Sequence, residues 1–214
     1  MKKLNGLVSK DPRLKKVYDW AKERYQELDL PQHNWEHVMR DLYRSLLIAD
    51  SEPGVDYSIL VPAVLLHDVG YQDANHRQHH TESAKIAQNL LPGLGYSKDE
   101  IGKISAAISS HGGDSEPESL EAKILFDADQ LEKSGIGGIF TLYRVQYELE
   151  IPLRDFINLV RNKIKKIKEQ GFYTLKAKEL CGQGLDEYLD HFDRVEEGLL
   201  KRPDFLVCEK DLWD

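Results

Sequence analysis

The apolar residues of this chain recur at spacings of three and four along nearly its whole length. Short breaks containing Gly, Pro, Asp and Ser separate these tracts, and no strand-like alternation of apolar and polar positions persists. The tracts predict helices over approximately residues 12–28, 34–49, 56–68, 80–91, 97–111 and 115–133. Residues 139 to about 200 predict three further amphipathic helices. We therefore expect an all-α fold.

One predicted helix differs from the others because it is apolar on nearly every side. Residues 59–66 read Ile-Leu-Val-Pro-Ala-Val-Leu-Leu. A helix that is apolar all round lies inside a bundle, because no face of it suits water. We expect this helix at the centre of the fold.

Capping residues indicate where several helices begin. Asp56 precedes the apolar helix, and Ser97 with Glu100 forms a capping box in which each side chain satisfies a backbone donor of the other residue. Pro152 is expected to open a later helix, where its missing N–H does no harm. The glycines within residues 135–138 are expected to break the chain.

The composition limits the classes of partner. The formal net charge is −8 and the isoelectric point is about 5.5, which disfavours the basic surface that long nucleic acids require. A small phosphorylated substrate stays compatible, because a metal ion and a few local cations can hold it. No run of 18 apolar residues predicts a membrane span.

The size and the cysteine content favour one cytoplasmic domain. We expect a single domain over residues 1–214. A chain of this length can bury a core that is stable without disulfide bonds or other cross-links. Cys181 and Cys208 fit neither a disulfide framework nor a zinc ribbon. Two reduced thiols in a cytoplasmic protein are the expected state.

The pair His67-Asp68 ends the apolar helix and is the first candidate site. A buried ionised carboxylate is costly unless a cation or hydrogen bonds compensate it, and a divalent metal does so economically. Imidazole and carboxylate together suit Mn, Fe, Zn, Ni or Mg. The alternative is a pair at a helix C-terminus that only hydrogen-bonds the backbone.

Two other segments offer further ligands. His37 lies four residues after His33, so the two can share a helix face, although a lone helical histidine is more often structural. Asp127 and Asp129 follow the apolar residues 124–126 and project about 200° apart on a helix, so at most one of them joins a given site. A solvated acidic face is the alternative for this pair.

Taken in order, these segments resemble the HD-domain superfamily of metal-dependent phosphohydrolases, and most closely its small bacterial and archaeal branch. The resemblance covers about residues 15–145 and rests on residues 33–40 (HNWEHVMR), 66–70 (LHDVG) and 127–131 (DADQL). It implies an orthogonal helical bundle with an HD metal-binding core over residues 15–145 and additional helices, residues 146–214, packed on it. It also implies one divalent ion (Mn, Fe, Ni, Co, Zn or Mg) whose ligands are His37, His67, Asp68 and Asp129, with Asp68 the catalytic candidate.

The same resemblance leaves the number of ions open. Two-metal members of the superfamily hold a second ion with histidines at positions similar to His80 and His111, bridged by the Asp of the His-Asp pair. The other interpretation is that His80 and His111 line the pocket and donate to phosphate. His76 and His79 are expected to be surface residues without a role.

The function implied is hydrolysis of a small nucleotide, or a related phosphate ester or anhydride, by a metal-bound water. Arg40, Arg77 and Lys133 are the candidate cations for the phosphate. Tyr71 stands where cyclic-dinucleotide phosphodiesterases of the superfamily carry Lys, which disfavours that activity. The alternatives are a di-iron oxygenase of the same fold and a nucleotide sensor without turnover.

The C-terminal third contains several aromatic residues at helical spacing. Such residues belong mostly to a core. The alternatives are that they cover the site or form a homodimer contact.

Overall fold

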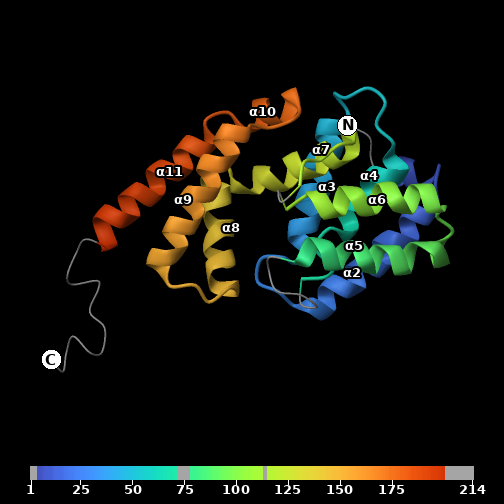
Figure 1. Ribbon diagram of the computed structural model, residues 1–214, viewed down its shortest axis with the longest axis horizontal. Helices are drawn as coiled ribbons and strands as arrows, with labels where there is room; N and C mark the ends of the chain where they lie inside the picture. The colour runs from blue at the N-terminus through green and yellow to red at the C-terminus, as the bar shows by residue number, and fades with distance from the viewer. Residues whose placement is uncertain (1–3, 72–77, 113–114, 201–214) are drawn as a thin grey trace. The chain divides into compact units, whose positions relative to one another are not determined.

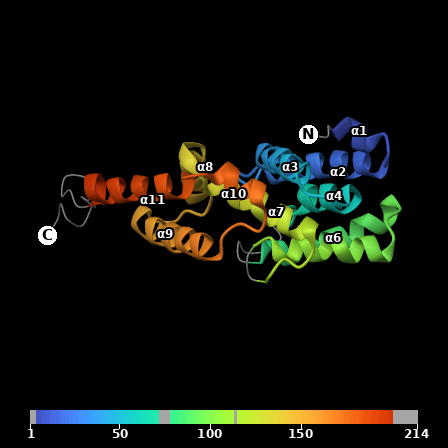
Figure 2. The same cartoon turned by 90° about the horizontal axis from the view of Figure 1, so that it is seen from above.

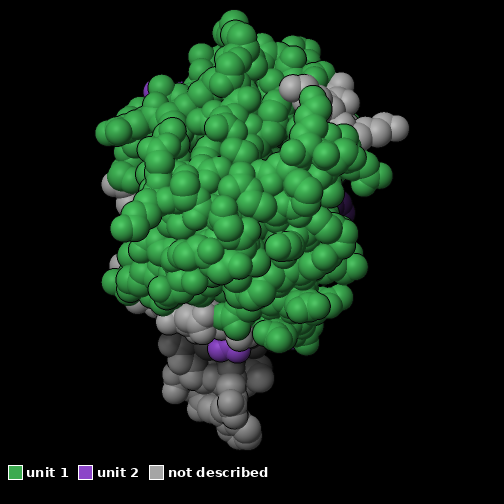
Figure 3. All heavy atoms as spheres, turned by 90° about the vertical axis from the view of Figure 1, so that its right-hand side faces the viewer, with its two compact units in different colours: residues 1–131, 172–180 green, residues 132–171, 181–214 purple. Residues whose placement is uncertain are grey.

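The computed structural model describes residues 4–71, 78–112 and 115–200, and every regular element within these ranges is helical (Figure 1). The all-α expectation is confirmed. The chain divides into two compact units, one of residues 1–131 and 172–180 and the other of residues 132–171 and 181–214 (Figure 3). None of the described helices combines the length and the apolar character that crossing a membrane requires.

Unit 1 contains most of the predicted helices. Its elements are α1 (Leu4–Val8), α2 (Arg13–Leu28), α3 (Trp35–Ala49), α4 (Tyr57–Leu66), α5 (His79–Leu90), the 3-10 turn η1 (Leu91–Leu94), α6 (Lys98–Ser110), α7 (Leu120–Gln130) and most of α10 (Leu175–Cys181). The sequence pattern did not predict α1, which is only five residues long. The helix expected from residues 115–118 begins later, because Ser119 is the residue that caps it, through the amide of Ala122.

Helix α4 lies at the centre of unit 1, as its apolar pattern predicts. All residues from Ile59 to Leu66 are buried. The helix packs against α2, α3, α6 and α7, and Figure 2 shows α2, α3, α6 and α7 grouped around it. The His67-Asp68 pair therefore emerges from the middle of the bundle, where other helices can bring side chains to it.

Side-chain caps fix where the helices start, including those expected at Asp56 and Ser97. The side chain of Asn34 also caps α3, because it accepts from the amides of Glu36 and His37, at 3.0 and 3.2 Å. Asp56 accepts from the amide of Ser58, and both bonds of the Ser97–Glu100 capping box are formed. The Asn34 cap places His37 in the first turn of α3.

Glu100 also ties α6 to the start of α2. Its carboxylate lies 2.8 Å from the guanidinium of Arg13, which pairs with Asp11 as well and lies over the ring of Tyr96. The hydrogen bond from Arg13 is the main cause that lowers the pKa of Glu100 from 4.5 to about 2.

Replacing Glu100 by Gln is expected to lower the free energy of unfolding at pH 7 by about 1 kcal/mol or less, because this ion pair is partly exposed to water. An acid with a lowered folded-state pKa stabilises the fold above its unfolded pKa and loses that contribution as the pH falls. The difference between the wild type and Glu100→Gln should therefore shrink from pH 4.5 toward pH 2. Urea denaturation at several pH values measures this difference in unfolding free energy. A difference that does not change with pH would contradict an origin in the ion pair of Glu100 with Arg13.

Unit 2 is built from α8 (Gly135–Glu148), α9 (Leu153–Gln170) and α11 (Gly184–Val195), with most of the 3-10 turn η2 (Leu131–Lys133) before them and a π-helical turn η3 (Glu196–Leu200) after them. Helix α11 packs against both α8 and α9. Pro152 immediately precedes α9, as expected. The region expected to hold three helices is divided further, because Gly182, with φ 49°, separates α10 from α11.

The expectation that the glycines of residues 135–138 break the chain holds only where they begin. The helical run ends at Lys133 and Gly135 has φ 65°, whereas Gly137 and Gly138 lie within the first turn of α8. A β-carbon at Gly138 would lie 2.6 Å from the carbonyl oxygen of Glu132 and 2.9 Å from the ring of Tyr188. Glycine is needed here for close packing within unit 2.

Candidate metal centre

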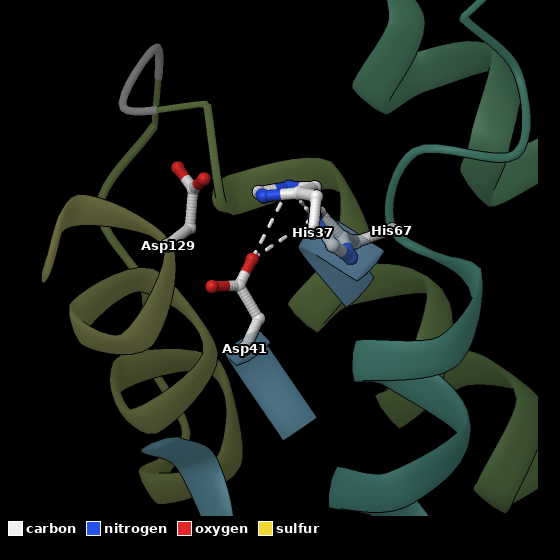
Figure 4. Close-up of side chains that lie close together, drawn as sticks. All are labelled: His37, Asp41, His67 and Asp129. Atoms are coloured by element: carbon white, nitrogen blue, oxygen red, sulfur yellow. Dashed lines mark hydrogen bonds and ion pairs between the residues drawn. The ribbon is translucent and has the colours of Figure 1, made fainter. Parts of the chain in front are cut away.

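Histidine and aspartate side chains from several helices of unit 1 converge beyond the C-terminal end of α4. Four of them offer ligand atoms that all lie within 4.8 Å of one another, and Figure 4 shows this group: His37 and Asp41 from α3, His67 after α4, and Asp129 from α7. His67, Asp68 and His111 form a second group of the same kind. The structure thus brings together residues that are up to 92 positions apart in the sequence (129 − 37).

The distances around His37 and His67 are those of ligands that share an ion. The two Nε2 atoms are 3.2 Å apart, and Asp68 Oδ2 lies 3.3 Å from each of them. Donor atoms about 2.1 Å from one ion lie roughly 3.0–3.4 Å from one another in octahedral or tetrahedral geometry. The donor set therefore fits a divalent metal.

The hydrogen bond on the other ring nitrogen of His67 supports this fit. Nδ1 lies 2.7 Å from the carbonyl oxygen of Val64, which can only accept, so Nδ1 carries the proton. In the neutral ring, Nε2 then presents a lone pair toward the carboxylate of Asp68. Two acceptors that face each other need a proton or a metal ion between them, and a carbonyl partner on the second nitrogen is the usual support of a metal-binding histidine.

A second pair of imidazoles faces the other oxygen of Asp68. His79 Nε2 and His111 Nε2 each lie 3.3 Å from Asp68 Oδ1 and 3.2 Å from each other. His111 Nδ1 lies 2.6 Å from the carbonyl oxygen of Ile108, which fixes its tautomer in the same way as that of His67. The carboxylate of Asp68 thus stands between two histidine pairs.

His79, rather than His80, belongs to this second pair, although His79 was expected to be a surface residue without a role. His80 lies beside Gly112, where an added β-carbon would be 3.1 Å from Nδ1. The two histidines are adjacent at the start of α5, so their directions depend on where the helix begins. His76 lies outside the described residues.

Asp68 is buried, and its surroundings favour the ionised form of its carboxyl group. Burial opposes its ionisation, but the charge of His67 and hydrogen bonds from His111, His37 and His67 hold its pKa well below the usual value. Burial likewise opposes protonation of His67, and the charge of Asp68 outweighs it and raises the pKa of His67. An ionised carboxylate is the form that a metal ion requires.

The arrangement matches a known family. Residues 34–134 match the HD domain. This part of the chain is an HD domain. No curated protein sequence matches the chain significantly.

Several solved structures share the fold. A predicted HD superfamily hydrolase from an uncultured Thermotogales bacterium is 24% identical, with 92% of this chain and 99% of that chain covered and a TM-score of 0.64. YpgQ of Bacillus subtilis, in complex with ADP, is 20% identical over 89% and 96% of the two chains, with a TM-score of 0.67. A protein from Lactobacillus plantarum is 20% identical over 88% and 97%, with a TM-score of 0.73.

Residues outside the His-Asp pair hold the central turn of the HD domain. The amide of Asp68 donates to the hydroxyl of Tyr25 at 3.1 Å, and Arg24 Nε donates to the carbonyl of Val69 at 3.2 Å. The amide of Gly70 donates to Ser83 Oγ at 2.9 Å. Helices α2 and α5 thereby fix the backbone that carries Asp68, and nothing in the sequence indicated Tyr25 or Arg24.

Only one aspartate of the pair in α7 joins the histidines, as their separation on the helix predicts. Asp129 belongs to the group with His37 and His67. Asp127 is fully buried and does not belong to this group. Its carboxylate accepts hydrogen bonds from the amides of Tyr173 and Thr174 and from the Thr174 hydroxyl. Burial raises the pKa of Asp127, and these hydrogen bonds oppose the rise.

The three predicted phosphate-binding cations lie in different parts of the chain. Arg40 follows His37 by one turn in α3 and is partly buried. Arg77 lies outside the described residues. Lys133 lies in η2 and belongs to unit 2. Their contact with a substrate stays a prediction.

Proposed function

We propose that this protein is a metal-dependent phosphohydrolase acting on a small nucleotide or a related phosphate ester or anhydride. The observation that carries the proposal is the buried Asp68, whose two oxygens face two imidazole pairs inside an HD domain. The shared fold with YpgQ, whose structure contains ADP, supports a nucleotide as the ligand class.

In this proposal His37, His67, Asp68 and Asp129 hold a divalent ion. When bound, such an ion polarises a phosphoryl oxygen and lowers the pKa of a water molecule toward neutrality. Val64 keeps the His67 ring in the tautomer that leaves Nε2 available.

Other residues of the chain would bind the phosphate. Arg40, Arg77 and Lys133 are proposed to do so, with the arginines suited to two parallel hydrogen bonds. His79 and His111 are proposed either to hold a second ion with Asp68 Oδ1 or to contact the phosphate directly.

The position of Asp68 also favours a second candidate, a di-iron oxygenase. A carboxylate with one oxygen toward each of two histidine pairs is suited to bridge two ions. This candidate requires two irons per chain and consumption of oxygen during turnover.

The deciding experiment measures the release of phosphate and pyrophosphate from a panel of nucleotides. Protein stripped with a chelator is refilled separately with Mn, Mg, Ni, Co or Fe, and His37→Gln protein purified in parallel reports contaminating phosphatases. We expect release that requires both the metal and His37. If full metal binding gives no release with any ion, the phosphohydrolase proposal fails, and the iron content with oxygen consumption then separates an oxygenase from a nucleotide sensor without turnover.

A further inference from the structure

Asp41 is a fully buried carboxylate in α3 that the sequence motifs did not single out. It follows His37 by four residues, so the two side chains lie on the same face of the helix. Both belong to the group of ligand atoms shown in Figure 4. A buried carboxylate needs a compensating charge, and its contacts show which charges are near.

The two oxygens of Asp41 have different surroundings. Oδ1 lies 3.1 Å from Arg44 Nη1. Oδ2 lies 3.2 Å from His37 Nε2 and 3.7 Å from His67 Nε2. Arg44 thus orients the carboxylate from one side while the other oxygen faces the two imidazoles.

A hydrogen bond from His37 does not account for this arrangement. Asp68 Oδ2 lies 3.3 Å from the same His37 Nε2, and one ring nitrogen can donate to only one of the two carboxylates. His67 Nε2 also lies 3.2 Å from His37 Nε2. Asp41 Oδ2 therefore belongs to the same set of converging donors.

We propose that Asp41 is a further ligand of the ion assigned to His37, His67, Asp68 and Asp129, and that Arg44 positions it. The inference rests on the metal centre of the proposed function, although not on phosphate hydrolysis. A set of three carboxylates and two imidazoles is rich in oxygen, which suits Mn²⁺ or Mg²⁺ better than an ion that prefers nitrogen ligands. Asp41 thereby biases the site toward Mn²⁺ relative to Zn²⁺.

The test measures Mn²⁺ and Zn²⁺ affinities of the full chain by calorimetry, without substrate. In Asp41→Asn the dissociation constant for Mn²⁺ is expected to rise at least about tenfold, and that for Zn²⁺ by a smaller factor. Asp50→Asn is the matched control, because Asp50 is an exposed carboxylate at the end of the same helix, and its affinities should not change. An unchanged Mn²⁺ affinity in folded Asp41→Asn protein would overturn the proposal.

A purely structural pair of Asp41 with Arg44 predicts a different pattern. In that case Asp41→Asn lowers the melting temperature of metal-free protein, whereas the rise in melting temperature on adding Mn²⁺ stays as large as in the wild type. A ligand role predicts that this rise shrinks. Because no step uses a nucleotide, Asp41 can be established as a ligand even if the wild type releases no phosphate.

A second variant keeps the proposal testable if Asp41→Asn does not fold. Asp41→Cys loaded with Co²⁺ is expected to show a thiolate-to-cobalt charge-transfer band in the near ultraviolet, because a coordinating thiol is deprotonated. Wild type and Asp50→Cys, which share the other cysteines of the chain, should lack the band. Its absence from folded, cobalt-loaded Asp41→Cys would refute a ligand at position 41.

Discussion

Replacing Asp68 by Asn is expected to remove metal-dependent turnover and to weaken metal binding at both histidine pairs. Asp68 Oδ2 faces His37 and His67, and Oδ1 faces His79 and His111, all at 3.3 Å. The amide of Asn has nearly the same size but brings no negative charge, and its nitrogen cannot coordinate an ion. We expect kcat/KM to fall by more than about a thousandfold, which corresponds to roughly 4 kcal/mol of transition-state stabilisation.

The measurement combines nucleotide turnover with metal content per chain, and circular dichroism confirms that the variant is folded. His111→Gln is the comparison variant, because His111 faces Asp68 Oδ1, whereas His37 and His67 face Oδ2. It should keep the ion at His37 and His67. Retained turnover in Asp68→Asn would contradict the assignment of Asp68, and equal metal loss in both variants would contradict two separable sets of ligands.

The features of the fold that depend on local chemistry were predictable from the sequence. The apolar run of residues 59–66 indicated a central helix, and α4 is buried along that run. Asp56 and the Ser97–Glu100 box gave correct helix starts. Each of these signals involves residues within one or two turns of one another, so periodicity and backbone hydrogen bonding suffice to interpret them.

The parts of the site that depend on tertiary contact were not predictable in this way. Asp41 and Tyr25 act through side chains that meet residues of other helices, and no spacing along the chain reveals those contacts. The choice between His79 and His80 depends on the direction in which α5 begins. The glycines of residues 135–138 were expected to break the chain, whereas Gly138 lies inside α8 and is required because the ring of Tyr188 lies against it.

The two aspartates of α7 are expected to separate stability from metal binding. Asp127→Ala removes the acceptor of the Thr174 amide and hydroxyl, at 2.8 and 2.7 Å, and of the Tyr173 amide at 2.9 Å. Buried donors that lose their acceptor are costly, so we expect the free energy of unfolding to fall by about 3 kcal/mol. Urea denaturation measures this loss, and the metal affinity of the folded variant should stay close to that of the wild type.

Asp129→Ala is the matched variant and should give the opposite result. Asp129 is only partly buried and offers its carboxylate to the group that contains His37 and His67, so its loss should weaken metal binding by at least about tenfold while changing stability by less than about 1 kcal/mol. Two residues of the same type, two positions apart on one helix, would then differ because of the direction in which each points. If Asp127→Ala lost the metal and Asp129→Ala lost the stability, the roles that the structure gives to these two carboxylates would be reversed.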